Sequence, residues 1–124
     1  MMQDGHRQFV AVVDDDDAVR DSLRFLLEAS GYDVLTFGSA GEFLSRADLS
    51  ALVCMLVDQH MPQVTGLELV ARVRESRPEL PVALMSGSPS AELTRRAFEL
   101  GVTAMLEKPL QEQGLLQFVE GAAE

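Results

Sequence analysis

The stretch Phe9–Val19, with the sequence FVAVVDDDDAV, places five apolar residues directly before four consecutive aspartates. The apolar run has no polar alternation and is rich in β-branched valine, which is typical of a strand buried on both faces of a parallel sheet. After the aspartates, apolar side chains recur at helical spacing. The stretch therefore predicts a buried strand, a polar turn and a helix.

The rest of the chain repeats this order, in which a short apolar run precedes a stretch of helical period. We expect strands at residues 9–13, 32–37, 52–57, 82–85 and 103–107, each followed by a helix. Such strict alternation is the signature of an α/β fold, here a doubly wound (βα)5 parallel sheet with helices on both faces. The second strand is more polar than the others, so we expect it at the sheet edge.

Local signals mark where several helices begin. Two capping boxes are expected, Ser39 with Glu42 and Thr65 with Glu68. Pro89 follows Ser88 and suits the first position of the fourth helix. Asp16 and Asp17 are expected only to begin the first helix, because acidic side chains favour the positive end of the helix dipole.

The length and charge of the chain limit its function. At 124 residues we expect a single domain over residues 1–124, with residues 1–8 as a flexible tail. A net charge of −10 without clustered cations argues against direct binding to nucleic acid. There is no apolar run long enough to span a membrane and no signal-type segment, and the single cysteine, Cys54, suits a reducing compartment. We therefore expect a cytoplasmic protein that does not bind membranes.

Chemically reactive side chains follow four of the five expected strands. They are Asp14 and Asp15 after the first strand, Asp58 after the third, Ser86 after the fourth and Lys108 after the fifth. In an open parallel sheet, the ligand crevice lies at the carboxyl ends of the strands, near the point where the strand order reverses. The pattern therefore gathers three carboxylates, one hydroxyl and one ammonium around a small volume.

Three adjacent carboxylates repel one another, and a hard cation with oxygen ligands relieves that repulsion. Asp14, Asp15 and Asp58 therefore predict a Mg²⁺ site. With the metal and Lys108 the site is near neutral and can accept a phosphoryl group, whose oxygens Lys108 and Ser86 can contact. A carboxylate can also act as a nucleophile and form an aspartyl phosphate. The plainer interpretation, that these acids only cap turns or helices, stays open at this point.

Four motifs, taken in order, resemble the receiver domain of two-component response regulators, from about Phe9 to about Val119. They are residues 12–20 (VVDDDDAVR), residues 56–58 (LVD) with Met61-Pro62 and Gly66, residues 84–87 (LMSG) and residues 107–109 (EKP). Each motif alone is weak, but four of them in order at these intervals are highly specific. The EKP ending and the loops are similar to the FixJ type of transcriptional regulator.

The resemblance implies a flavodoxin-like strand order 2-1-3-4-5 and a signalling function controlled by phosphorylation. In receivers, the acids that correspond to Asp14 and Asp15 hold Mg²⁺, together with the backbone carbonyl that corresponds to His60. The residue that corresponds to Asp58 binds the metal and takes a phosphoryl group from a phosphohistidine on a sensor histidine kinase or a phosphotransfer protein. The Lys108-Pro109 peptide bond is expected to be cis.

Two positions depart from the commonest family pattern. Ser86 stands where threonine is also common, and it keeps the hydroxyl without the methyl group that restricts the rotamer. Met105 stands where an aromatic residue usually turns inward during switching, and its flexible side chain can fill the same gap without a fixed orientation. Ser86, Lys108 and Met105 are thus the expected phosphoryl-binding and switch residues. The His60 side chain is expected to be solvated in an exposed loop.

The resemblance implies a signalling domain that is not an enzyme beyond self-phosphorylation and slow autodephosphorylation. It would relay its signal through the fourth helix, fifth strand and fifth helix, residues 89–119, a face that often forms a homodimer, to a DNA-binding output domain outside this chain. One alternative is a small Mg²⁺ phosphohydrolase of the haloacid dehalogenase type, which Asp14 and Asp16 favour and Ala18 opposes. Another is a degenerate receiver that only binds partners.

Overall fold

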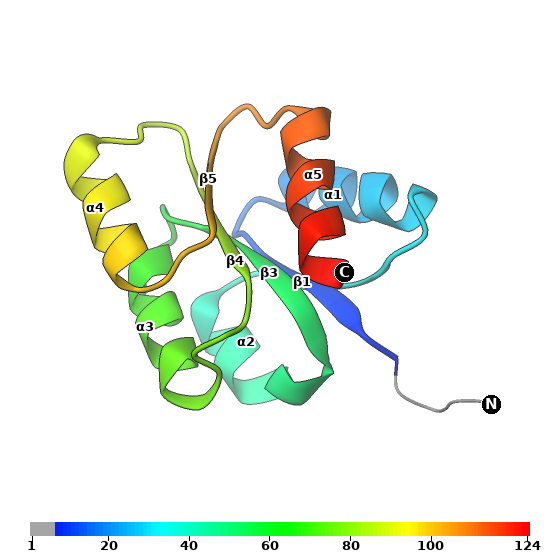
Figure 1. Ribbon diagram of the computed structural model, residues 1–124, viewed down its shortest axis with the longest axis horizontal. Helices are drawn as coiled ribbons and strands as arrows, with labels where there is room; N and C mark the ends of the chain where they lie inside the picture. Colours follow the sequence, from blue (N-terminus) through cyan, green and yellow to red (C-terminus); the bar gives the residue numbers. More distant parts are fainter. Residues whose placement is uncertain (1–6) are drawn as a thin grey trace.

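The computed structural model describes residues 7–124, which contain one five-stranded sheet. All neighbouring strands pair in parallel, in the order β2-β1-β3-β4-β5 (Figure 1). The strands are β1 (Phe9–Val13), β2 (Asp33–Phe37), β3 (Leu52–Asp58), β4 (Val82–Ser86) and β5 (Ala104–Glu107). The predicted α/β class and strand order are confirmed, and the more polar β2 lies at the sheet edge.

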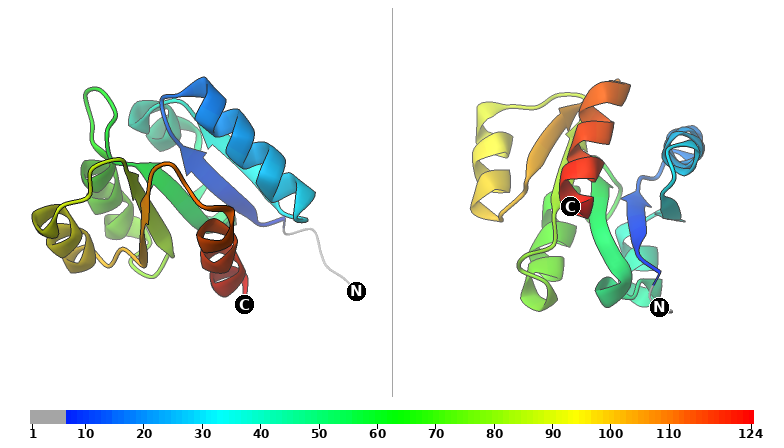
Figure 2. Two further views of the ribbon diagram at one scale, coloured as in Figure 1. Left: turned by 90° about the horizontal axis from the view of Figure 1, so that it is seen from above. Right: turned by 45° about the vertical axis from the view of Figure 1, so that its right-hand side comes forward.

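Five α-helices alternate with the strands in the described residues. They are α1 (Asp17–Ala29), α2 (Ala40–Arg46), α3 (Gly66–Ser76), α4 (Ala91–Glu99) and α5 (Glu112–Ala123). A short 3-10 helix, η1 (Leu49–Ala51), which the sequence pattern does not predict, precedes β3. Helices α1 and α5 cover one face of the sheet, and α2, α3 and α4 cover the other (Figures 1 and 2).

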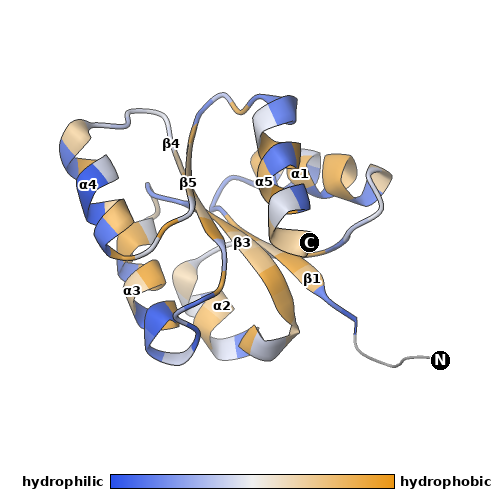
Figure 3. Ribbon diagram, in the orientation of Figure 1, coloured by the Kyte–Doolittle hydropathy of each residue, from blue (hydrophilic) through white to orange (hydrophobic). Residues whose placement is uncertain are grey.

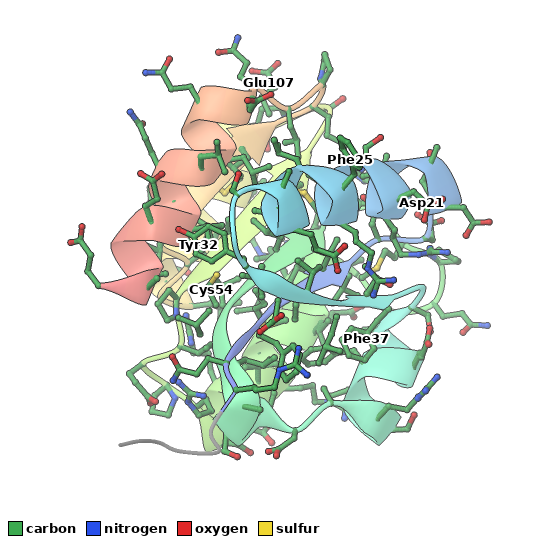
Figure 4. All side chains as sticks on the ribbon, turned by 90° about the vertical axis from the view of Figure 1, so that its right-hand side faces the viewer. Asp21, Phe25, Tyr32, Phe37, Cys54 and Glu107 are labelled. Atoms are coloured by element: carbon green, nitrogen blue, oxygen red, sulfur yellow. The ribbon has the colours of Figure 1, made fainter. Side chains whose placement is uncertain are left out.

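Strand side chains alternate between two buried apolar layers. In β1, Val10 and Val12 pack in the layer with α1 and α5, whereas Ala11 and Val13 pack in the layer with α2, α3 and α4. Figure 3 shows apolar residues along the strands and polar residues on parts of the helices. Cys54 lies in the first layer, wholly buried (Figure 4), and burial raises the pKa of its thiol to about 12. It is the small buried hydrophobe that its place in a strand predicts.

The sequence signals predict the start of α3 correctly but not the start of α4. Thr65 and Glu68 form the expected capping box at α3. Pro89 does not begin α4, so this prediction is wrong: the helix begins at Ala91, and the Ser90 side chain caps it by accepting the Leu93 N–H at 3.0 Å. The physical reason is that the Ser88 N–H donates to a strand side chain, Ser86 Oγ, which fixes this segment as a loop.

The second expected capping box is only half formed. Ser39 Oγ accepts the Glu42 N–H at 3.0 Å, as predicted. The Glu42 carboxylate instead accepts the N–H of Gly38, one residue before the cap, at 2.7 Å. The backbone N–H groups of Gly38 and Glu42, at the start of α2, are therefore both hydrogen-bonded.

The first described residues are tied to the edge strand. Arg7 pairs with Asp33 at 3.0 Å and lies over the ring of Phe9. Of the expected flexible tail, residues 1–8, residues 1–6 lie outside the described residues. In residues 7–124, no helix combines the length and apolar character needed to cross a membrane.

Candidate functional site

Three polar side chains are buried at the carboxyl edge of the sheet, and they are the only buried polar or charged residues in the part of the chain that the structure describes. Asp14 follows β1, Asp58 ends β3 and Ser86 ends β4, with exposed fractions of 0%, 3% and 0%. The Lys108 side chain follows β5 and is 24% exposed. Because parallel strands end at the same edge, residues up to 94 positions apart meet there.

In the turn after β1, Asp14 belongs to the buried site, whereas Asp16 begins helix α1. Asp16 is the N-cap of α1 and accepts the backbone N–H groups of Ala18 and Val19 at 2.9 and 3.3 Å. The N–H of Asp16 donates to Asp14 Oδ1 at 2.9 Å, which holds the Asp14 carboxylate in the buried crevice. Asp15 lies between them and is exposed. The Asp16 side chain begins the helix as predicted, and the Asp16 backbone N–H also supports Asp14.

Arg20 braces the same turn from α1. Its Nη1 donates to the carbonyl oxygen of Asp14 at 2.6 Å, and its Nη2 pairs with Asp17. The Asp14 N–H donates to the carbonyl oxygen of Phe37 at 3.1 Å. The backbone at Asp14 is therefore held from both sides, which fixes the direction of its carboxylate.

Lys108 joins the two buried carboxylates. Its Nζ lies 2.8 Å from Asp14 Oδ2 and 3.3 Å from Asp58 Oδ1. Burial alone would lower the pKa of Lys108, but the hydrogen bond to Asp14 and the charges of Asp14 and Asp58 outweigh it and raise that pKa. Lys108 is therefore a fixed positive charge at the centre of the site. Its peptide bond to Pro109 is cis.

Asp58 is under electrostatic strain. Burial, and then repulsion by Asp14, raise the pKa of its carboxyl, although Lys108 and the backbone N–H of His60 act in the opposite direction. The His60 N–H donates to Asp58 Oδ1 at 3.3 Å. A partly desolvated carboxylate whose charge is incompletely balanced is poised to react with or bind a further group.

The acidic residues form a set that could hold a metal ion. Carboxylate oxygens of Asp14, Asp15 and Asp58 lie within 4.8 Å of one another. The ammonium group of Lys108 balances one of these three formal negative charges and lies between the carboxylates of Asp14 and Asp58. The remaining two charges and the all-oxygen donor set fit a divalent hard cation such as Mg²⁺.

Ser86 is in contact with a residue whose side-chain position the sequence does not predict. His60 is exposed as expected, but its Nε2 lies 3.2 Å from Ser86 Oγ. Ser86 Oγ also accepts the Ser88 N–H at 3.1 Å. His60 and Ser86 are 26 positions apart, and no sequence motif predicts this contact between the loop after β3 and the end of β4.

The loop after Asp58 is anchored to the start of α3. The Gly66 N–H donates to the carbonyl oxygen of Gln59 at 3.1 Å, and Gln59 Oε1 accepts the Leu67 N–H at 2.9 Å. A Cβ atom at Gly66 would lie 2.6 Å from the carbonyl oxygen of Asp58, so only glycine fits there. This contact explains why the motif around Asp58 includes a glycine at residue 66.

Met105 lies within β5. It is partly buried, pairs with Leu84 of β4 and packs against the apolar layer beneath α2, α3 and α4. Its neighbours Leu106 and Glu107 continue the strand to Lys108. The expected switch position is thus in contact with the apolar core.

Comparisons with known proteins agree with this geometry. The family model described as response regulator receiver domain matches residues 10–120. The transcriptional regulatory protein FixJ of Bradyrhizobium diazoefficiens is 35% identical over 122 residues, which cover 98% of this chain and 58% of that protein. The transcriptional regulatory protein TdiR of Thauera aromatica is 39% identical over 119 residues, with 95% and 52% covered. The chain spans about half the length of these curated relatives.

Solved structures show the same fold. The chemotaxis protein CheY4 of Vibrio cholerae superposes with a TM-score of 0.86 at 27% identity, over 94% of this chain and 98% of that one. The crystal structure of FixJ-N superposes with a TM-score of 0.80 at 28% identity, over 98% and 95%. The fold of this chain is therefore shared with these solved structures.

Proposed function

Because this chain belongs to the family of response regulator receiver domains, we propose that Asp58 is its phosphoacceptor. The phosphoryl donor is a phosphohistidine on a sensor histidine kinase or a phosphotransfer protein. An oxygen of the Asp58 carboxylate forms a bond to phosphorus, the bond between phosphorus and the imidazole nitrogen breaks, and the imidazole leaves with the electron pair. The product is an aspartyl phosphate.

The observation that carries this proposal is the bridge of Lys108 between Asp14 and Asp58. Asp58 is the acid at the centre of the site, buried and within 3.3 Å of a fixed ammonium group. An incoming phosphoryl group brings additional negative charge to this point, and Lys108 is already placed to balance its oxygens. Ser86 Oγ, at the end of the neighbouring strand, supplies the hydroxyl that can donate to a phosphoryl oxygen.

The same acids would hold Mg²⁺. Asp14, Asp15 and Asp58 supply carboxylate oxygens, and the backbone carbonyl of His60, in the loop after Asp58, would supply a further oxygen ligand. Bound Mg²⁺ neutralises negative charge on the acids and on the phosphoryl oxygens. The chain's own part is to keep Asp14 and Asp58 directed inward, which Arg20 and the N–H of Asp16 do for Asp14.

The signal would leave the site through Ser86, Met105 and Lys108. We expect Ser86 to move toward the phosphoryl group and the loop that leads to α4 to follow, because the Ser88 N–H is bonded to Ser86 Oγ. The affected surface is formed by α4, β5 and α5, the face expected to form a homodimer. Output by a DNA-binding domain and slow autodephosphorylation are part of the same proposal.

Labelling with acetyl phosphate tests the acceptor directly. In Mg²⁺, the wild-type chain is expected to gain the mass of one phosphoryl group, and Asp58→Asn is expected to gain none. Asp16→Asn is the matched control, because asparagine caps a helix as well as aspartate and Asp16 lies outside the buried site. Labelling that persisted in Asp58→Asn would remove the assignment.

Two further measurements separate the alternatives. A ligand that binds only the folded state raises the melting temperature, so Mg²⁺ at ten times its dissociation constant is expected to add about 1.4 kcal/mol of stability. The absence of any Mg²⁺-dependent shift would point to a degenerate receiver. Sustained turnover of p-nitrophenyl phosphate would point to a phosphohydrolase.

A further inference from the structure

We propose that His60 is a positioning residue that holds the Ser86 hydroxyl in the resting state and releases it when Asp58 is phosphorylated. The inference rests on the proposed role of Asp58 as phosphoacceptor. It assigns a task to a side chain at the crevice that the proposed phosphotransfer does not use. It starts from the 3.2 Å contact between His60 Nε2 and Ser86 Oγ.

The direction of this hydrogen bond follows from the partners of Ser86. The hydroxyl is 0% exposed, and its oxygen already accepts the N–H of Ser88 at 3.1 Å. The hydroxyl proton needs an acceptor, since a buried unsatisfied donor costs free energy. Among the described residues, His60 Nε2 is the side-chain acceptor within hydrogen-bonding distance. We therefore assign the Ser86 O–H as the donor and His60 Nε2 as the acceptor of this hydrogen bond.

A hydroxyl has a single proton to donate. While Ser86 donates to His60, it cannot donate to a phosphoryl oxygen on Asp58. The phosphoryl group must therefore compete with His60 for the hydroxyl, and the His60 bond favours the unphosphorylated arrangement. The release of His60 would accompany the movement of Ser86 and, through the Ser88 N–H, of the loop that leads to α4.

The expected effect has a size and a direction. A net intramolecular hydrogen bond contributes about 1 kcal/mol, which corresponds to roughly a fivefold change in an equilibrium constant. Removal of the His60 bond should therefore strengthen binding of a phosphoryl mimic at Asp58 by about fivefold. A residue that merely stabilised the loop would weaken that binding or leave it unchanged.

The probe is beryllofluoride in the presence of Mg²⁺, with its apparent dissociation constant measured from backbone amide signals in NMR titrations. His60→Phe keeps a planar ring and removes the acceptor, and it should bind the probe about fivefold more tightly than wild type. His60→Gln offers an amide that can reach the hydroxyl, and it should return the affinity toward the wild-type value. Unchanged or weaker binding in His60→Phe would overturn the proposal.

The Ser86→Ala background isolates the specific contact. Ser86→Ala alone should weaken binding, because the mimic loses its hydroxyl donor. Adding His60→Phe to Ser86→Ala should then change nothing, since the hydroxyl that His60 holds is absent. An equal gain in both backgrounds would mean that His60 acts by another route, and the proposal would fail.

The role of Asp58 is checked separately in the same titrations. Wild-type protein that binds the probe while Asp58→Asn does not would support the acceptor assignment, whatever the His60 variants show. A wild-type chain that did not bind the probe would overturn the acceptor role, and the inference about His60 with it. The two failures are therefore distinguishable.

Discussion

Leu56 and Asp58 are two residues apart on β3, and both are almost wholly buried, at 0% and 3% exposure. Leu56 lies in an apolar layer, where its burial removes hydrocarbon from water and stabilises the fold. Asp58 lies at the strand end beside Asp14, where burial and the neighbouring charge disfavour its ionised form. Similar burial thus stabilises the fold at Leu56 and disfavours the charge of Asp58, two residues further along the same strand. In the proposed function, this site would bind a cation and accept a phosphoryl group.

The first prediction tests the apolar interior and carries the largest effect. Leu56→Ala should lower the free energy of unfolding by about 3 kcal/mol, because it removes buried methylene groups and leaves a cavity. Denaturant unfolding followed by circular dichroism measures the loss. Leu56→Met, which nearly conserves volume, should cost less than about 1.5 kcal/mol. A loss below 1 kcal/mol for the alanine variant would show that the interior of β3 is not tightly packed.

The second prediction removes the cation from the strained edge. In metal-free buffer, Lys108→Ala should lower the free energy of unfolding by about 1–2 kcal/mol. This is less than the roughly 3–5 kcal/mol expected for breaking a fully buried pair, because Lys108 is 24% exposed. The loss arises because Asp14 and Asp58 are left without their positive partner. Unfolding in EDTA gives the value.

Magnesium provides the check on this second prediction. Mg²⁺ should stabilise Lys108→Ala more than it stabilises wild type, because the variant has one more uncompensated negative charge. Lys108→Arg keeps the charge and should lie closer to wild type in metal-free buffer. If Mg²⁺ stabilised all three proteins equally, the acids and Lys108 would not form one electrostatic unit.

The fold could be predicted from the sequence because its signals are local. The run Phe9–Val13 predicts a buried strand by composition alone, and the polar residues of 32–37 predict an edge strand. To predict that the polar residues at the strand ends form one site, one further rule is required: ligand sites lie at the carboxyl ends of parallel strands. That rule is general, so Asp14, Asp58, Ser86 and Lys108 could be placed together in advance.

The contacts that depend on loop paths could not be predicted. His60 lies beside Ser86 because β3 pairs with β4, where Asp58 is opposite Met85, and the sequence carries no signal for this side-chain contact. Local propensity does not report a contact between residues 26 positions apart. The start of α4 differs for a local reason: the Ser88 N–H donates to Ser86 Oγ, two residues earlier, and Ser90 caps the helix instead.

The third prediction is a substitution of a buried charged residue that stabilises the fold. Asp58→Asn should raise the free energy of unfolding by roughly 1 kcal/mol at neutral pH without metal, since it removes a buried charge that repels Asp14. Above the ordinary pKa of an aspartate and up to the raised pKa of Asp58, the folded state binds more protons than the unfolded state. Stability therefore falls as pH rises through this window.

The pH dependence gives the matched control for this third prediction. Below the ordinary pKa of an aspartate, Asp58 is protonated in both states, so the advantage of Asp58→Asn should disappear there. Asp16→Asn, at the exposed helix cap, should show no such pH-dependent gain. Destabilisation by Asp58→Asn at neutral pH would mean that Lys108 already balances the site fully.

The fourth and smallest effect is expected at Arg95, whose two ion pairs have nearly the same nitrogen–oxygen distances as the two ion pairs of Lys108. Arg95 on α4 lies 3.3 Å from a Glu92 carboxylate oxygen and 2.7 Å from one of Glu99, which closely match the 3.3 and 2.8 Å of Lys108. The Arg95 side chain is 58% exposed, and water and salt screen its pairs.

Arg95→Ala should therefore change the free energy of unfolding by less than about 0.5 kcal/mol, and added salt should remove even that difference. Parallel unfolding curves for Arg95→Ala and Lys108→Ala, at low and high salt, make the comparison. Because the distances match, a larger and less salt-sensitive loss for Lys108→Ala can be attributed to burial. Equal losses would mean that the sheet edge is as well solvated as the surface of α4, and the strain assigned to Asp58 would have no physical basis.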